Sequence, residues 1–166
     1  MKYSMIDDGK QLKAAASYFS RFISQARAHY DLVVLDCNPS SSFVTKCALE
    51  NSTHVISPVR PDKYSILGVG MVDQLFTHLG VGVEHMVIFN GVRRYGPRTN
   101  VENELRTHST FGPKTLIGRL VTSNLLAADP SYTGFATDKQ RPYSHTLRRE
   151  IEAISDEIAQ KLGFQR

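Results

Sequence analysis

The chain has 166 residues, of which 41% are hydrophobic and 22% charged, and these proportions exclude disordered and fibrous proteins. Its length predicts one domain over residues 1–166 with a core of its own. No window approaches the roughly 18 apolar residues of a membrane span, and the first residues lack the apolar core of a signal peptide. We therefore expect a cytoplasmic protein without a membrane partner, and its net charge of +4 allows a polyanionic one.

The first half of the chain alternates helical and strand patterns. Apolar residues at a three-to-four spacing predict a helix over about residues 9–29, which leads into the uninterrupted apolar run Leu32–Leu35. Such a run, bounded by polar residues, is typical of a strand buried on both faces. The next elements are a short helix after the serines, a strand and a long helix, at about residues 42–49, 54–59 and 62–79.

The second half repeats the alternation. We predict strands over residues 84–90 and 115–120, with a helix over about 100–108 between them. Turn-forming residues dominate from 121 to 142, and a last amphipathic helix covers about 144–162. Strands alternating with helices predict an α/β fold in which a parallel sheet carries helices on both faces.

The residue after the first apolar run is Asp36, and two interpretations of it stay open. An aspartate at a strand end can simply cap the following turn. A carboxylate in this position can also serve as a Walker B acid, which holds Mg²⁺ beside nucleotide phosphates. The second interpretation gains weight from the neighbouring residues.

Residues 30–40, Tyr-Asp-Leu-Val-Val-Leu-Asp-Cys-Asn-Pro-Ser, resemble the Tyr-Asp-apolar-Asp-Cys-Pro-Pro-Ser segment of the ParA/MinD family of deviant Walker-type P-loop ATPases. Later segments resemble the ParA branch in the same order, and they are the Pro58–Pro61 turn, the 87–90 strand, Arg98–Asn100, the 115–119 strand and the closing helix. The chain departs from the family by having Asn38 at a frequent proline position. It also contains no Gly-Lys-Ser/Thr phosphate loop.

The resemblance implies a P-loop NTPase-like fold of which this chain is the C-terminal two-thirds, with the phosphate-loop portion missing at the N-terminus. It implies ATP and Mg²⁺ as family cofactors and Asp36 as the Mg²⁺-associated residue, provided that a phosphate loop is supplied. The implied switch and base-contacting residues are Cys37, Asn38, Pro39, Ser40 and Asn90, although Asn90 could equally be a strand-end turn residue. Without the loop, we expect no catalytic residue, no tight cofactor binding and no ATP hydrolysis by this chain alone.

Basic residues are concentrated in one part of the chain. Residues 91–149 hold ten basic against four acidic residues, whereas residues 1–90 hold eight of each. These charges are either a solvated surface or a sequence-independent site for DNA phosphates, the way in which ParA-like proteins bind DNA. The candidate DNA contacts are Arg93, Arg94, Arg98, Arg106, Arg119, Arg148 and Arg149.

The sequence thus predicts a ParA-like plasmid or chromosome partition protein, a fragment or degenerate form of an ATPase that binds DNA non-specifically. The alternatives are a non-catalytic module that dimerises with a full-length ParA-like partner, and one half of a split ATPase. A homodimer and a ParB-like partner are further expectations from the resemblance. A sheet without its early strands would also expose apolar surface, which favours a partner.

Overall fold

A computed structural model describes residues 5–37, 42–94, 97–123, 126, 134–135, 137–138 and 144–164, with side chains from residue 9 onward. The chain divides into two compact units, and each is described here by itself. Unit 1 contains Met1–Thr53 and Phe76–Val83, and unit 2 contains His54–Leu75 and Glu84–Arg166. The single domain over residues 1–166 stays a prediction.

Unit 2 is built on a three-stranded parallel sheet. Its strands are β1 (His54–Val59), β2 (Glu84–Val92) and β3 (Thr115–Val121), in the order β1-β2-β3. β1 and β2 pair in step from one end to the other, whereas the register between β2 and β3 shifts. The strands predicted at 54–59, 84–90 and 115–120 are confirmed, and so is the α/β fold class.

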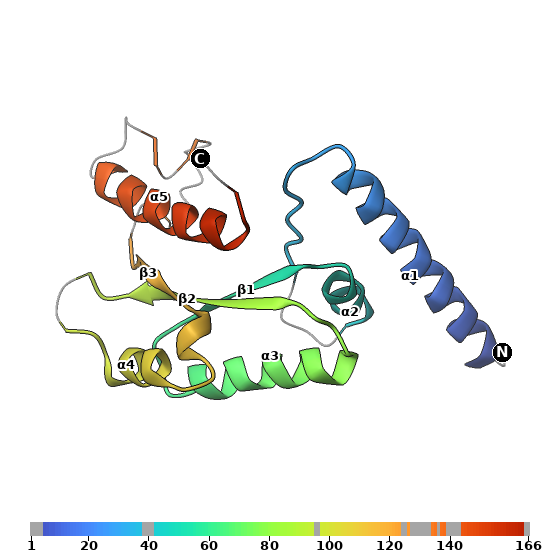
Figure 1. The fold of residues 1–166 in the computed structure, drawn as a ribbon, viewed down its shortest axis with the longest axis horizontal. Coiled ribbons are helices and arrows are strands. Elements are labelled where there is room, and N and C mark those ends of the chain that lie inside the picture. Colours follow the sequence, from blue (N-terminus) through green and yellow to red (C-terminus); the bar gives the residue numbers. More distant parts are fainter. Residues whose placement is uncertain are drawn as a thin grey trace. The chain divides into compact units, whose positions relative to one another are not determined.

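Helices lie on both faces of this sheet (Figure 1). On one face lie α3 (Ser65–Leu79), α4 (Asn100–Thr107) and the short 3₁₀ turn η1 (Gly112–Lys114), and on the other lies α5 (Ser144–Lys161). Each was predicted from the sequence except η1, although α3 begins three residues later than expected. α4 begins with a capping box, because Thr99 accepts from the Glu102 amide and the Glu102 carboxylate accepts from the Thr99 amide.

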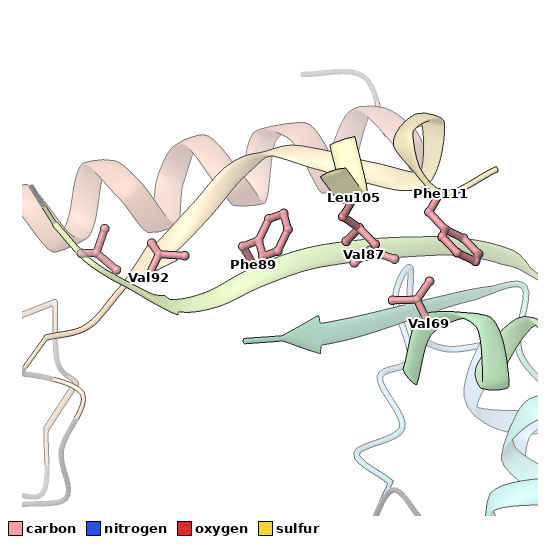
Figure 2. Packing of buried hydrophobic residues seen from close by; sticks show 7 residues of the cluster. Val69, Val87, Phe89, Val92, Leu105 and Phe111 are labelled. Carbon is pink, nitrogen blue, oxygen red and sulfur yellow. The ribbon is translucent and has the colours of Figure 1, made fainter. Parts of the chain in front are cut away.

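The core of unit 2 lies between the sheet and the helices of the α3 and α4 face (Figure 2). β2 contributes the centre of this core, because Val87 and Phe89 are fully buried. Leu105 of α4 is buried to the same extent. The whole cluster comprises Val69, Val87, Phe89, Val92, Leu105, Phe111 and Val121. Burying a side chain of this kind contributes about 1.5–3 kcal/mol, so this cluster stabilises unit 2.

The register shift in β3 is held from both sides by charged side chains. Arg106 of α4 donates to the carbonyl oxygens of Leu116 and Ile117, at 2.7 and 3.2 Å. From α5, the Glu157 carboxylate accepts the amides of Ile117 and Gly118, at 2.7 and 2.8 Å. Backbone groups that the irregular strand leaves outside the β2–β3 ladder are therefore satisfied by side chains.

Unit 1 contains α1 (Met5–Arg27) and α2 (Phe43–Glu50), both close to their predicted positions. Asn51, at the end of α2, connects the two helices by accepting from the Ser20 hydroxyl at 2.8 Å and from the Arg27 guanidinium. Ser42 caps α2, because its hydroxyl oxygen accepts from the Thr45 amide. None of the described helices is long and apolar enough to cross a membrane.

The strand predicted at Leu32–Leu35 is wrong. Residues 32–37 form a coil between α1 and α2, and Leu32 and Val34 are 55% and 77% exposed. A strand that is buried on both faces needs a neighbouring strand and a cover on each face. The run lies in unit 1, whereas the three strands of the described residues all belong to unit 2.

Candidate functional site

The segment that carries the Walker B resemblance ends in an exposed coil. Asp36 and Cys37 are both exposed and follow no strand. Asn38, Pro39 and Ser40, the remaining residues of the implied switch, lie outside the described residues. Asn90, the implied base contact, belongs to unit 2 whereas Asp36 belongs to unit 1. The roles implied for these six residues therefore stay predictions.

The carboxyl edge of the sheet in unit 2 gathers polar residues. Asn90 is exposed near the end of β2, and Gly91 beside it has a positive φ of 69°. Arg60 follows β1, and its Nε lies 3.3 Å from the position that a Cβ on Gly91 would take. Glycine thus serves two needs here, a left-handed backbone and room for the Arg60 guanidinium. In open parallel sheets this edge is where ligands bind.

Four of the seven arginines predicted as DNA contacts have partners within unit 2. Arg94 pairs with Glu150 at 3.0 Å, and Arg119 pairs with Glu102 at 3.3 Å. Arg148 donates to the Thr137 carbonyl oxygen at 2.8 Å. Arg106 holds the β3 carbonyls and lies over the Phe89 ring. The hydrogen bonds of these four side chains connect elements of the fold.

Burial and neighbouring arginines act together on Arg106. Desolvation lowers the pKa of its guanidinium, and the charges of Arg98 and Arg119 lower it further, against the opposite effect of Glu102 and Glu157. Glu102 itself is 1% exposed, so its carboxylate sits inside this group of arginines.

The other three predicted contacts, Arg93, Arg98 and Arg149, are exposed, and no ion pair joins them to another described residue. Arg93 directly follows β2, and Arg98 lies just before α4, which begins at the same edge of the sheet. With Arg60 they form what we call the edge arginines, Arg60, Arg93 and Arg98. The sequence analysis missed Arg60 because it lies outside the basic stretch, although it follows a predicted strand as Asp36 does.

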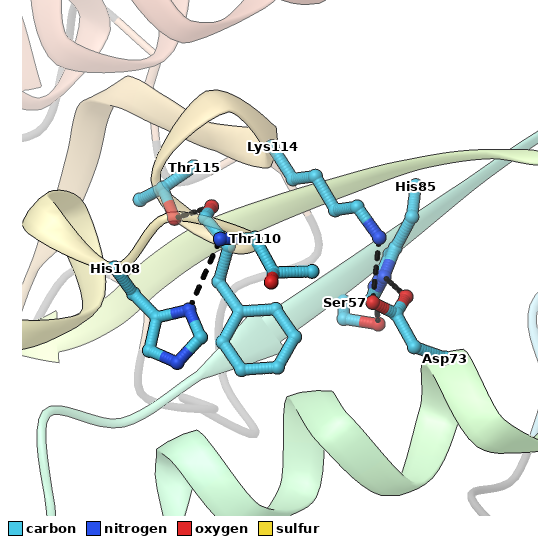
Figure 3. A network of polar contacts seen from close by, with 8 residues as sticks. Ser57, Asp73, His85, His108, Thr110, Lys114 and Thr115 are labelled. Atoms are coloured by element: carbon cyan, nitrogen blue, oxygen red, sulfur yellow. Dashed lines mark hydrogen bonds and ion pairs between the residues drawn. The ribbon is translucent and has the colours of Figure 1, made fainter.

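A second polar cluster lies toward the amino-terminal side of the sheet (Figure 3). The ring of His85, at the start of β2, bonds through Nδ1 to Asp73 of α3 at 2.8 Å and through Nε2 to the Ser57 hydroxyl of β1 at 2.9 Å. The other carboxylate oxygen of Asp73 accepts from the Lys114 ammonium at 2.5 Å. The cluster therefore connects β1, β2, α3 and η1.

The protonation of this cluster follows from its burial. Since the His85 side chain is 1% exposed, desolvation lowers the pKa of the ring, and this outweighs the opposing effect of Asp73. Desolvation alone would raise the pKa of Asp73, but the bonds and charges of Lys114 and His85 hold it below its ordinary value. A neutral ring with its proton on Nδ1 donates to Asp73 and accepts from Ser57.

These contacts have the connectivity of a serine–histidine–aspartate triad. Ser57 lies in the middle of β1, however, and not on the sharp turn that presents a nucleophile to a substrate. Lys114 also pairs with the carboxylate that would orient the histidine. The cluster is therefore a structural link, and sequence spacing missed it because Asp73 and Lys114 are 12 and 29 positions from His85.

The residues present do not fit an ATP–Mg²⁺ complex by themselves. Mg²⁺ requires several oxygen ligands, and the described part of the chain contains no group of three acidic, histidine or cysteine side chains placed to hold a metal. The sequence also lacks the Gly-Lys-Ser/Thr loop that cradles phosphates.

Comparisons with known proteins connect the chain to ATPases. A family model described as an AAA domain matches residues 4–81. An uncharacterized protein of Pseudomonas putida is 28% identical over 139 residues, which cover 78% of this chain and 52% of that protein. The chromosome-partitioning ATPase Soj of Thermus thermophilus is 32% identical over 134 residues, which cover 75% of this chain and 53% of Soj.

The chain thus spans about half the length of the curated relatives it matches. Together with the parallel α/β sheet, these matches agree with the resemblance in residues 30–40 and in the later segments. The matches therefore support the resemblance of the chain to the ParA-like family of P-loop ATPases.

Proposed function

We propose that the chain is a ParA-like partition protein, a fragment or degenerate form of the ATPase, that binds DNA through phosphates without reading its sequence. The edge arginines carry this proposal, since Arg60, Arg93 and Arg98 are exposed where the strands of unit 2 end. Phosphate contacts by such side chains give affinity without base recognition. We place this activity in the cytoplasm, with a ParB-like protein as a further proposed partner.

The salt dependence of DNA retention tests the proposal. Each phosphate contact contributes about 0.9 to the slope of log affinity against log salt on duplex DNA. Replacing two edge arginines, as Arg93→Ala/Arg98→Ala, should therefore lower the slope by about 1.8. The measurement is fluorescence anisotropy of a labelled random-sequence duplex, titrated at several salt concentrations.

A matched control removes the same charge elsewhere. Lys13 and Arg21 are exposed on α1 in unit 1, so Lys13→Ala/Arg21→Ala changes the net charge equally. We expect this variant to keep the wild-type slope. Equal slopes for both double variants would show that net charge alone attracts DNA, and binding that does not respond to salt would refute the proposal.

We further propose that the chain does not hydrolyse ATP alone, because its residues offer no cradle for the phosphates. The test is phosphate release by the purified chain, with and without Mg²⁺. Release that Asp36→Ala abolishes would overturn this part of the proposal.

A second candidate function is an interaction module that binds a longer ParA-like chain or completes a split ATPase. Apolar exposure favours it, because nearly half of the exposed large hydrophobic side chains of the described chain lie between residues 12 and 44. Exposed apolar surface of this kind is typical of proteins that bind a partner. The candidate predicts ATP hydrolysis only on mixing with a chain that carries a phosphate loop.

A further inference from the structure

An ion pair within unit 2 joins the end of β2 to α5. Arg94 is the second residue after β2, and its Nη1 lies 3.0 Å from Oε1 of Glu150 in α5. The two side chains are 30% and 23% exposed. Water therefore screens this pair less than an ion pair on an open surface, and the attraction between its charges is correspondingly stronger.

The two partners depend on this pair to different extents. The guanidinium of Arg94 has five N–H donors, and the Glu150 carboxylate accepts from its Nη1. The other carboxylate oxygen of Glu150, Oε2, is buried and has no hydrogen-bond partner among the described residues. Glu150 thus relies on Arg94 for its one side-chain bond in the described part of the chain, whereas Arg94 has further donors to offer.

This difference matters for a DNA phosphate that approaches the edge arginines. A phosphate could bind Arg94 only by taking it from Glu150, which would leave a largely buried carboxylate without a partner. Removing one partner of a buried ion pair carries a large penalty, because the remaining charge is uncompensated. Arg93 and Arg98 carry no such penalty, since they are exposed and form no ion pair with a described residue.

The pair also directs Arg94 away from its neighbour Arg98. Arg98 lies just before α4, which covers one face of the sheet, whereas α5 lies on the opposite face (Figure 1). Glu150 therefore holds the Arg94 guanidinium toward the α5 face. Two arginines that are four positions apart at one edge of the sheet are in this way turned to different surroundings.

We propose that Glu150 sets the DNA affinity of unit 2 by withholding Arg94 from phosphates, so that the chain binds DNA with one contact fewer than its arginines allow. Glu150 is a positioning residue, because it acts through Arg94 and does not touch DNA. The inference rests on the proposed DNA binding, and it deepens that function by naming the residue that restrains it. Loss of the Glu150 charge should add Arg94 to the edge arginines as a further contact.

Two substitutions on α5 test the proposal in the full chain. Glu150→Gln keeps the size of the side chain and removes its charge, and Glu152→Gln removes the same charge from an exposed side chain outside the ion pair. DNA titrations at several salt concentrations give the slope of log affinity against log salt. We expect Glu150→Gln to raise this slope by about 0.9, the value of one phosphate contact, and Glu152→Gln to leave it unchanged.

A double variant shows whether Glu150 acts through Arg94. Arg94→Ala/Glu150→Gln should bring the slope back to its wild-type value, because the released guanidinium is gone. A merely structural role of Glu150 would instead lower the urea midpoint of Glu150→Gln without raising the slope. Far-UV circular dichroism checks that each variant is folded.

The wild-type chain allows a direct measurement. In NMR spectra of the arginine Nε–H groups, DNA should shift the signals of Arg93 and Arg98 and leave that of Arg94 in place. In Glu150→Gln, the Arg94 signal should shift as well. This readout follows the contact itself and does not depend on the stability of a variant.

Three results would overturn the proposal. They are equal slopes for Glu150→Gln and Glu152→Gln, a raised slope that persists in Arg94→Ala/Glu150→Gln, and a shift of the Arg94 signal by DNA in the wild-type chain. If Arg93→Ala/Arg98→Ala lowers the slope in the same experiments, DNA binding stands and only the restraint by Glu150 fails. Failure of both the wild type and Glu150→Gln to bind DNA at low salt would refute the restraint and the proposed function together.

Discussion

Removing the Asp73 carboxylate is the most direct test of the cluster that connects the sheet of unit 2 to α3. In Asp73→Ala, the Nδ1–H of His85 loses this acceptor in a site where the ring is 1% exposed. Losing the partner of a buried polar group costs about 1–3 kcal/mol. Lys114 is 31% exposed, so its ion pair adds at most about 1 kcal/mol. We expect a total loss of about 2–3 kcal/mol.

Urea unfolding followed by circular dichroism measures this loss as a lower midpoint. Because the chain has two units, hydrogen exchange at the β2 amides is needed to assign the change to unit 2. The control is Glu104→Ala, which removes an exposed carboxylate from α4 and should change stability by less than about 0.5 kcal/mol. A loss for Asp73→Ala no larger than that of the control would refute the argument from burial.

Three further outcomes follow from the packing and burial of unit 2. Burial holds the pKa of His85 below its unfolded value of 6.5, so stability is complete above that pH and falls as the pH drops toward the folded pKa. The fall between pH 7.5 and 5, measured by urea unfolding, should be shallower in His85→Gln. Gly118→Ala would place a Cβ 2.8 Å from Cγ1 of Ile154, and overpacking should cost about 1–3 kcal/mol, seen as a lower thermal midpoint. Leu105→Ala, at a fully buried position, should cost about 2–5 kcal/mol in urea unfolding, and a loss below about 1 kcal/mol would contradict its place in the core.

Most elements could be predicted from the sequence because their patterns are local. The α4 cap, for example, depends on Thr99 and Glu102, which are three positions apart. β1 was predicted with its observed bounds because Pro61 lies two residues beyond its end, although Pro58, also expected to end the strand, lies within it. The run Leu32–Leu35 was mispredicted because apolar composition shows that a segment tends to be buried, whereas burial as a strand also requires a neighbour.

The candidate site was harder to predict, because its contacts depend on register. His85 meets Ser57 only because β1 and β2 pair from His54 and Glu84 onward. Arg119 and Arg106 were grouped with the other arginines by charge, although their partners are fixed by the packing of α4 against β3. Charge count along the sequence identified a basic region but could not separate exposed arginines from those that hold the fold together.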